Sequence, residues 1–200
     1  MCSWCWAFKP TWKKVKEALP NNIKIHYLLG GLAPDNEDQM HPDMQEHIRG
    51  IWKKIQEDIP DIEFNYDFWT LNTPKRSTYA ACRAVICAKN QSAKYETLMI
   101  EGIQNDYYLN AKNPSNDNVL ISIAKRIGLD KEKFIKDLNS ADIIQSLIAE
   151  IKITRALPIN GFPSIILKSN NKIKIVKIDY RDPNYIINQI IPCIKTNKWQ

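Results

Sequence analysis

The sequence lacks long apolar runs, internal repeats and low-complexity tracts. None of its segments approaches the ~20 apolar residues that a membrane-spanning helix needs. No signal peptide of basic, apolar and small residues occurs either, since only Met1 precedes the first cysteine. These absences favour a globular protein of one domain, or of one domain with an inserted subdomain, that works in the cytoplasm without binding a membrane.

The chain contains few cysteines, and their number, five, is odd. An odd total argues against the paired disulfide framework of a small secreted protein. Cys82 and Cys87 are five positions apart in an apolar segment, and Cys193 lies near the end. We expect these three thiols to be buried and unreactive.

Basic side chains exceed acidic ones, which gives a net charge of +6, but they are scattered along the chain. The one cluster is typical of the solvated face of a hairpin, and neither a base-stacking motif nor a basic helix accompanies it. Nucleic-acid binding is therefore not expected. The members of this cluster are Lys168, Lys172, Lys174 and Lys177.

The histidines follow no pattern that predicts a site. His26, His41 and His47 are the only ones in the chain, and none has the spacing of a metal ligand relative to another. A zinc ion on Cys2 and Cys5 would need two further ligands, so no metal is expected. No Ser-His-Asp set is visible either.

What the chain does have is a cysteine pair at its start, in Met1-Cys2-Ser3-Trp4-Cys5-Trp6. Residues three positions apart share one face of a helix, so the two sulfurs would lie one turn apart. The unpaired N–H groups and the positive dipole end of a helix start favour a thiolate over a thiol. The motif therefore indicates a dithiol that can close to a disulfide and reopen.

Apolar side chains at three- and four-residue spacing predict helices over most of the chain. Residues 61–72 are expected to be loop with a turn of helix. The expected helices cover residues 3–19, 42–58, 77–89, 93–108 and 119–127, followed by a short helix capped by Asp130, a long one capped by Ser140 and a last one starting at Asp182-Pro183.

Strands are expected in three places. Alternation of apolar and polar residues predicts a short strand over residues 23–29, and β-branched runs at 164–168 and 172–178 predict a hairpin. Two prolines lie within expected helices. We expect Pro10 to kink the first helix and Pro192 to interrupt the last one.

This order of elements, together with several motifs, resembles the DsbA-like family of thioredoxin-fold proteins, and most closely its FrnE-like, mostly cytoplasmic branch. The resemblance implies an α/β fold in which a thioredoxin-like domain, residues 1–60 and 157–200, carries an inserted all-helical domain with its linkers, residues 61–156. The motifs that carry the resemblance are Cys2-Ser3-Trp4-Cys5-Trp6-x-Phe8, Ala81-Cys82-Arg83-Ala84-Val85, Ile103-Gln104 with Tyr107-Tyr108, and Gly161-Phe162-Pro163-Ser164.

The resemblance implies an enzyme, a thiol-disulfide oxidoreductase or isomerase that acts on the thiols and disulfides of proteins or peptides. Apart from its own redox-active disulfide it needs no cofactor, and glutathione is a candidate exchange partner. Cys2, at the helix edge, is expected to be the attacking thiolate, and Cys5, on the apolar stripe, the buried resolving thiol. Ser3 can offer a hydroxyl hydrogen bond and Trp4 carries no charge, so we expect a moderately lowered pKa for Cys2, which favours a reductase or isomerase over a strong oxidant.

Four further residues are expected to contact the substrate. The family implies that Pro163 is a cis proline facing the cysteine pair, and that Phe162 offers backbone groups to an extended peptide. Trp4 and Trp6 flank the cysteines and can form an apolar lip for an unfolded substrate. Packing of Trp6 into the helical block is an equally good interpretation.

One expected strand is missing. The family has a strand directly before the cysteine motif, in the middle of the sheet beside the strand expected at 164–168, whereas here only Met1 precedes the motif. A lost central strand leaves backbone groups unpaired, at about 1–3 kcal/mol each. A start assigned too late, a truncation or a strand from a partner would each explain this. We expect a native N-terminus upstream of Met1, where a signal peptide would change the expected compartment.

Two other functions remain open. The kappa-class glutathione transferases and hydroxychromene-carboxylate isomerases share this fold and its helical insert, but they have serine at the position of Cys2 and lack the second cysteine. A redox-inactive protein that binds a partner in a helix-lined groove is the other alternative. Reduction of a protein disulfide, compared with glutathione conjugation, separates the oxidoreductase from the transferase. Inactivity in both assays would favour the binding protein.

Overall fold

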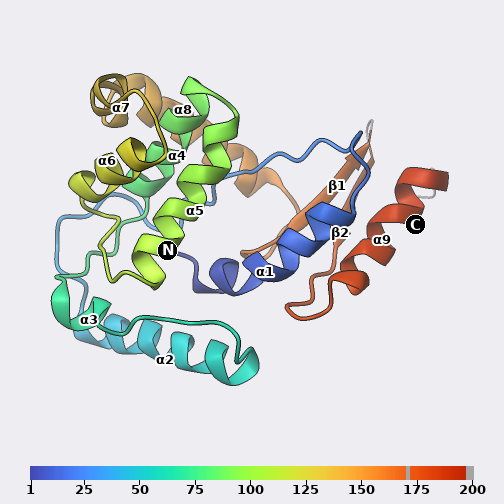
Figure 1. The fold of residues 1–200 in the computed structure, drawn as a ribbon, viewed down its shortest axis with the longest axis horizontal. Coiled ribbons are helices and arrows are strands. Elements are labelled where there is room, and N and C mark those ends of the chain that lie inside the picture. Colours follow the sequence, from blue (N-terminus) through green and yellow to red (C-terminus); the bar gives the residue numbers. More distant parts are fainter. Residues whose placement is uncertain (170–171, 197–200) are drawn as a thin grey trace.

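The computed structural model describes residues 1–169 and 172–196, which form nine helices and a two-stranded sheet (Figure 1). Each predicted helix is present, with its ends within about one turn of the expected positions. In chain order the elements are α1 (Ser3–Ala18), α2 (Pro42–Asp58), α3 (Phe68–Leu71), α4 (Tyr79–Gln91), α5 (Lys94–Tyr108), α6 (Asp117–Arg126), α7 (Lys131–Leu138), α8 (Ala141–Ala156), β1 (Ile165–Ser169), β2 (Lys172–Val176) and α9 (Pro183–Thr196).

Polar side chains cap several helix starts, as predicted. Asp130 and Ser140 accept the backbone N–H groups of Lys133 (2.9 Å) and Ile143 (3.4 Å) and so begin α7 and α8. Asp182 accepts a backbone N–H in the first turn of α9 at 2.8 Å. Each cap satisfies one of the N–H groups that a helix start leaves unpaired, which fixes where the helix begins.

Helices α4 to α8 form one block, in which α4 is the central element (Figure 1). Helix α4 contacts α5, α6, α7 and α8, and its side chains are buried on almost every face. Such enclosure suits the apolar composition of this helix, which leaves it without a polar face for solvent. The core of the block includes Ala84, Ala88, Met99, Leu120, Ile123 and Phe134, all fully buried.

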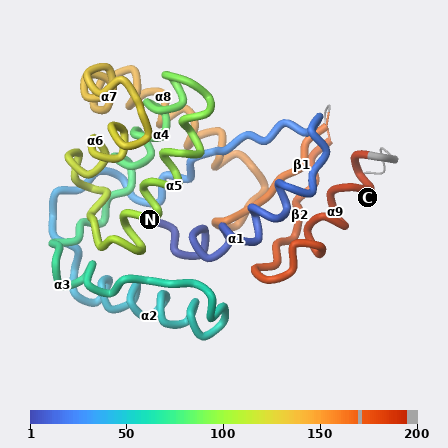
Figure 2. Tube along the Cα trace, in the orientation of Figure 1, coloured from blue at the N-terminus to red at the C-terminus, as the bar shows by residue number. Residues whose placement is uncertain are grey.

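The hairpin and the two terminal helices form the other part of the molecule (Figure 2). Strands β1 and β2 are antiparallel, with Ile165 opposite Val176. Helices α1 and α9 pack against each other and against one face of this hairpin. Their shared core contains Phe8, Val15, Val176, Ile186 and Ile190.

The predicted strand over residues 23–29 is wrong, because this segment is coil. A strand needs a neighbour to receive its backbone hydrogen bonds, and none of the described residues forms a ladder with this segment. Its last residue is held by helix α8 instead. The Leu29 N–H donates to the Glu150 carboxylate at 2.7 Å, and the Leu29 carbonyl accepts from the Thr154 hydroxyl at 3.1 Å.

The predicted interruption at Pro192 is also wrong, since α9 continues through it to Thr196. Proline removes a backbone donor but has a φ that suits a helix. Ile190 and Cys193, on either side of Pro192, are 3% and 2% exposed. Burial of these neighbours favours continuing the helix over ending it. Helix α1 also continues through Pro10, and the kink expected there stays a prediction.

An aromatic cluster joins α1, α2, α3 and α5. Trp52 on α2 is fully buried at its centre, and Trp6 on α1 is packed into the same cluster. The cluster therefore draws residues from both sides of the predicted domain boundary at residue 60, and the boundary itself stays a prediction. The other rings of the cluster belong to Phe64, Phe68, Trp69, Tyr107 and Tyr108. Within the described ranges, no helix combines the length and the hydropathy needed to cross a bilayer.

Candidate functional site

Cys2 is the N-cap residue of α1, so its own sulfur caps the helix. Its φ and ψ are −90° and 105°, and its Sγ accepts the backbone N–H of Cys5 at 3.2 Å. The Cys2 carbonyl also accepts the N–H groups of Cys5 and Trp6, at 3.1 and 3.2 Å. Both cysteines are free thiols in the structure and both are half-buried. Cys5 is thus more accessible than the fully buried thiol expected from its place on the apolar stripe.

The two sulfurs differ in how firmly they hold a proton. The pKa of Cys2 is lowered, mainly because the Cys5 thiol donates a hydrogen bond to its sulfur, with backbone N–H groups of the helix start adding to the effect. The pKa of Cys5 is raised by the same shared hydrogen bond and by burial. A thiolate is stabilised by donors and by the positive end of a helix dipole. The geometry therefore makes Cys2 the more acidic of the two thiols.

Phe162 and Pro163 lie across from this pair, although they follow it by about 160 residues. The Cys2 thiol faces the Phe162 carbonyl oxygen, with an Sγ–O distance of 3.6 Å. The peptide bond between Phe162 and Pro163 is cis. The ring of Phe162 packs directly on the backbone of Gly30, where a Cβ atom would lie 2.4 Å from the ring carbon Cζ. Gly30 is thus a site residue that the sequence analysis missed.

The two tryptophans of the motif have different surroundings. Trp6 is 8% exposed, its ring stacks on Tyr108 with the centroids 5.3 Å apart, and its indole N–H donates to the Glu63 carbonyl at 3.1 Å. Trp6 therefore packs into the helical block. The prediction that Trp6 helps to form an apolar lip for the substrate is wrong. Trp4 is half-buried and lies against Tyr180, with a centroid distance of 5.1 Å.

Tyr180 is a second residue that the sequence analysis missed. Burial, together with the neighbouring Cys2 and Cys5, raises its pKa to about 12. Its carbonyl accepts the Thr11 hydroxyl at 2.6 Å, which ties it to α1. No sequence motif includes Tyr180, because it lies in the connection between β2 and α9. Only the tertiary structure brings it near the cysteines.

The side chain of Ser3 points into the protein, away from the role expected for it. Ser3 is 7% exposed and its hydroxyl oxygen accepts the indole N–H of Trp52 at 2.9 Å. The first of the two residues between the cysteines is therefore hydrogen-bonded to helix α2. The partner lies 49 positions away, which is why the local sequence gave no sign of it.

A cavity of about 360 Å³ adjoins the cis proline. It is lined by residues 158–164, which include Phe162 and Pro163, and by residues 175–178 at the end of β2. Its lining residues include Ile159, Ile175 and Ile178 together with the polar Asn160 and the basic Lys177. This hollow is large enough to accept one side chain of a peptide lying along the turn.

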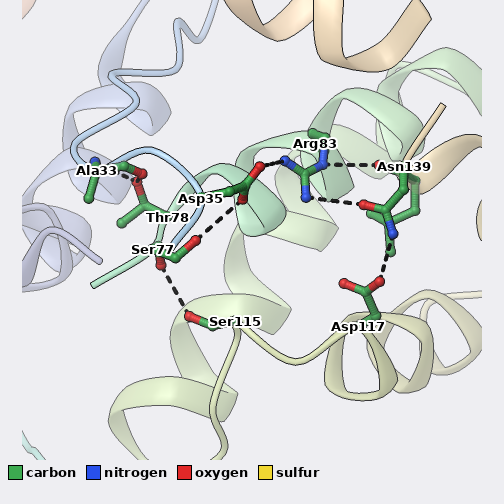
Figure 3. Close-up of polar contacts among 9 residues, drawn as sticks. Ala33, Asp35, Ser77, Thr78, Arg83, Ser115, Asp117 and Asn139 are labelled. Atoms are coloured by element: carbon green, nitrogen blue, oxygen red, sulfur yellow. Dashed lines mark hydrogen bonds and ion pairs between the residues drawn. The ribbon is translucent and has the colours of Figure 1, made fainter. Parts of the chain in front are cut away.

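A separate polar network surrounds the buried Arg83 of α4 (Figure 3). Its guanidinium donates to the Asp35 carboxylate (2.5 Å), the Asn139 side chain (3.1 Å) and the Leu138 carbonyl (3.2 Å). Asn139 in turn donates to Asp117 at 2.7 Å. The network borders a cavity of about 260 Å³ that includes neither cysteine of the motif.

Cys87 and Cys193 are buried as expected, whereas Cys82 is half-buried, and the Lys174 ammonium donates to the Cys193 sulfur at 3.5 Å. Burial raises the pKa of Cys82 to about 11 and that of Cys87 to about 12, and Cys193 is 2% exposed. Among the residues with described positions, no three His, Cys, Asp or Glu side chains are grouped so as to hold a metal ion.

A dithiol at the start of a helix, facing a cis proline before a hairpin, defines a thioredoxin-like protein. The family model described as thioredoxin matches residues 1–189. The chain therefore belongs to the thioredoxin family, and its helical insertion makes it DsbA-like.

The chain is also similar to a curated protein over nearly its whole length. The chain is 24% identical over 196 residues to the ClpXP adapter protein SpxH of Halalkalibacterium halodurans, a match that covers 96% of this chain and 63% of the relative. It thus spans less than two thirds of the length of that relative.

Two solved structures share the fold. One is a "putative protein disulfide isomerase" from Nitrosomonas europaea, at 19% identity and a TM-score of 0.84, covering 99% of this chain and 95% of the other. The other is the cytosolic disulfide reductase DsbM from Pseudomonas aeruginosa, at 16% identity and a TM-score of 0.73, covering 98% and 94%. DsbM has also been solved with GSH.

Proposed function

We propose that this protein is a thiol-disulfide oxidoreductase that acts on protein or peptide disulfides through Cys2 and Cys5. The observation that carries the proposal is the position of the Cys2 sulfur. It accepts the Cys5 N–H at 3.2 Å and lies 3.6 Å from the Phe162 carbonyl. The Cys2 sulfur therefore has a lowered pKa and lies beside a backbone carbonyl of the turn before β1.

The exchange takes place in two steps. The Cys2 thiolate attacks one sulfur of a substrate disulfide, forming a mixed disulfide and releasing the other substrate sulfur, which takes up a proton. The Cys5 thiol then loses its proton and attacks the Cys2 sulfur. A Cys2–Cys5 disulfide forms and the second substrate thiol leaves, so the substrate has gained two electrons and two protons. A dithiol or glutathione returns the enzyme to its reduced form.

The substrate is an extended segment of peptide. The backbone of Phe162 and Pro163 offers one side of its binding site, and the half-buried ring of Trp4, held against Tyr180, offers an apolar surface beside the sulfur. The cavity next to the cis proline can take one side chain. Such a site recognises shape and apolar character more than sequence.

The test is reduction of insulin disulfides by dithiothreitol with the protein as catalyst. Cys2→Ser is expected to abolish catalysis, whereas Cys5→Ser should accumulate a mixed disulfide visible by mass spectrometry. Alkylation of the reduced protein at neutral pH should label Cys2 before Cys5, because Cys2 has the lower pKa. Full turnover by the Cys2→Ser variant would refute the proposal.

Two other functions have their own tests. Conjugation of glutathione to a model electrophile is expected to fail, because Cys2 and Cys5 do not match a glutathione transferase site. The name of the relative from Halalkalibacterium halodurans favours a second candidate, an adapter that binds a protein partner. A folded protein that is inactive in both assays would favour this adapter role.

The cellular setting belongs to the same proposal. We place the protein in the FrnE-like branch and in the cytoplasm, where the dithiol would meet a reducing thiol pool. The solved relative DsbM is described as a cytosolic disulfide reductase, which supports this placement. In that setting reduction or isomerisation of disulfides, and not their net formation, is the expected direction.

A further inference from the structure

We propose that Trp52 is a positioning residue for the dithiol: its indole N–H holds the Ser3 hydroxyl and thereby the start of helix α1, where Cys2 lies. The inference rests on the proposed function, because it takes Cys2 to be the reactive thiol. It adds a residue of helix α2 that acts on the dithiol through Ser3.

The contact between Trp52 and Ser3 is short and fully enclosed. The Nε1–Oγ distance is 2.9 Å, Trp52 is 0% exposed and Ser3 is 7% exposed. The Ser3 hydroxyl also lies beside the buried Tyr108 hydroxyl, but water does not reach either group, so breaking the bond to Trp52 costs more than breaking one at the surface. The Ser3 side chain is therefore held in one orientation.

Trp52 is itself held rigidly. Its indole contacts the rings of six other aromatic residues, with centroid distances from 4.8 to 6.2 Å. A group packed on every side cannot follow a moving partner. The N–H thus acts as a fixed point to which the first turn of α1 is attached. The six rings are those of Phe64, Tyr66, Phe68, Trp69, Tyr107 and Tyr108.

Fixing Ser3 also fixes the sulfur cap. Ser3 is the first helical residue and Cys2, directly before it, is the N-cap whose Sγ accepts the Cys5 N–H. A hydrogen bond weakens steeply as its angle and length depart from the optimum. A first turn that moves freely would loosen the bond between Cys5 N–H and the Cys2 sulfur, and would stabilise the thiolate less.

The same cluster provides a matched control. Trp69 lies 5.1 Å from Trp52 between ring centroids and is 8% exposed. Its indole N–H makes no hydrogen bond to any part of the chain that the structure describes. Trp52→Phe and Trp69→Phe therefore remove the same atoms from the same core, but only Trp52→Phe removes a bond to Ser3.

The experiment measures the rate at which iodoacetamide alkylates Cys2 as a function of pH, in reduced protein. Trp52→Phe is expected to move the midpoint of this profile to higher pH and to lower the rate at pH 7 by about two- to tenfold, the effect of losing one ordinary hydrogen bond. Trp69→Phe is expected to follow the wild-type profile. A Trp52→Phe profile that coincides with that of the wild type in folded protein would overturn the proposal.

Ser3→Ala and the double variant complete the test. Ser3→Ala should shift the profile in the same direction, and the double variant should shift it no further than either single one, because both changes break the same bond. Shifts that add would overturn the proposal, as would an unshifted Ser3→Ala profile if Trp52→Phe does not fold. The wild-type profile separately tests the proposed function, because a Cys2 thiol with an ordinary pKa would refute that function. The inference about Trp52 depends only on the differences between the variants and the wild type.

Discussion

At the scale of single residues, the site depends on a difference in pKa between two chemically identical side chains, those of Cys2 and Cys5. Cys2 accepts hydrogen bonds from both the side chain and the backbone of Cys5, while Cys5 is left as the donor. The Cys-x-x-Cys spacing predicted that the two sulfurs are neighbours, and the place of Cys2 at the helix start predicted that Cys2 has the lower pKa. The direction of the Ser3 side chain was not predictable, because it is set by Trp52 on another helix.

Substitution of Gly30 by alanine tests the contact that places Phe162. The added Cβ would lie 2.4 Å from the ring of Phe162, so this ring, whose residue carries the carbonyl facing Cys2, must shift. We expect Gly30→Ala to lower the free energy of unfolding by about 1–3 kcal/mol, the cost of overpacking, and to slow disulfide reduction several-fold. Chemical denaturation and the insulin assay measure the two effects.

Two further variants control this prediction. Gly50 lies in helix α2 with no atom near the position of an added Cβ. Gly50→Ala should therefore stabilise the protein by about 0.5–1 kcal/mol and leave the activity unchanged. Adding Phe162→Leu to Gly30→Ala should recover part of the lost stability, and no recovery would mean that the ring contact is not the cause.

At the scale of elements, the helical block is held together by polar contacts as well as by its core. Arg83, in the middle of α4, reaches the loop that contains Asp35 and the junction between α7 and α8 at Leu138 and Asn139 (Figure 3). The sequence placed Arg83 in an apolar helix but did not show its partners, since these lie between 48 and 56 positions away.

Replacing Arg83 by methionine is expected to destabilise the protein without changing the dithiol. The Arg83 side chain is 8% exposed and its partner Asp35 is 52% exposed, so part of the charge left behind can be solvated. A loss of about 3 kcal/mol, at the lower end of the range for breaking a buried pair, is expected in urea denaturation. The alkylation profile of Cys2 should not move.

Arg49→Met is the surface counterpart of this change. Its pair with Glu46 is exposed, at 49% and 77%, so the loss should stay below about 1 kcal/mol. Equal losses for the two arginine variants would contradict the structural role of Arg83.

At the scale of the whole molecule, the site lies where the parts of the chain meet. Helix α1 brings Cys2, the turn before β1 brings Phe162, and the connection after β2 brings Tyr180. Helix α2 supports this arrangement through Trp52. Folding as a whole is therefore coupled to the ionisation of the dithiol.

The stability of the reduced protein is expected to rise with pH towards the ordinary thiol pKa of about 8.5. Because the pKa of Cys2 is lowered in the folded state, the unfolded chain binds more protons between the folded and unfolded pKa values, and the free energy of unfolding increases across that window. Above about pH 8.5 the raised pKa of Cys5 acts in the opposite direction, since only the unfolded chain then loses that proton.

Urea denaturation at several pH values, with a phosphine reductant present, measures this dependence. Cys2→Ser is the matched control, because serine keeps an N-cap oxygen that does not titrate. The difference in stability between the wild type and this variant should grow from pH 6 to pH 8.5. A constant difference would contradict a lowered Cys2 pKa.

By itself the sequence determined the helices, the caps at Asp130, Ser140 and Asp182, the hairpin and the dithiol, because each depends on residues a few positions apart whose periodicity and capping chemistry are local. Only the tertiary structure decided that residues 23–29 remain coil, that Trp6 is buried and that Ser3 points towards Trp52. These outcomes depend on contacts between distant segments, where burial and hydrogen-bond partners outweigh local preference.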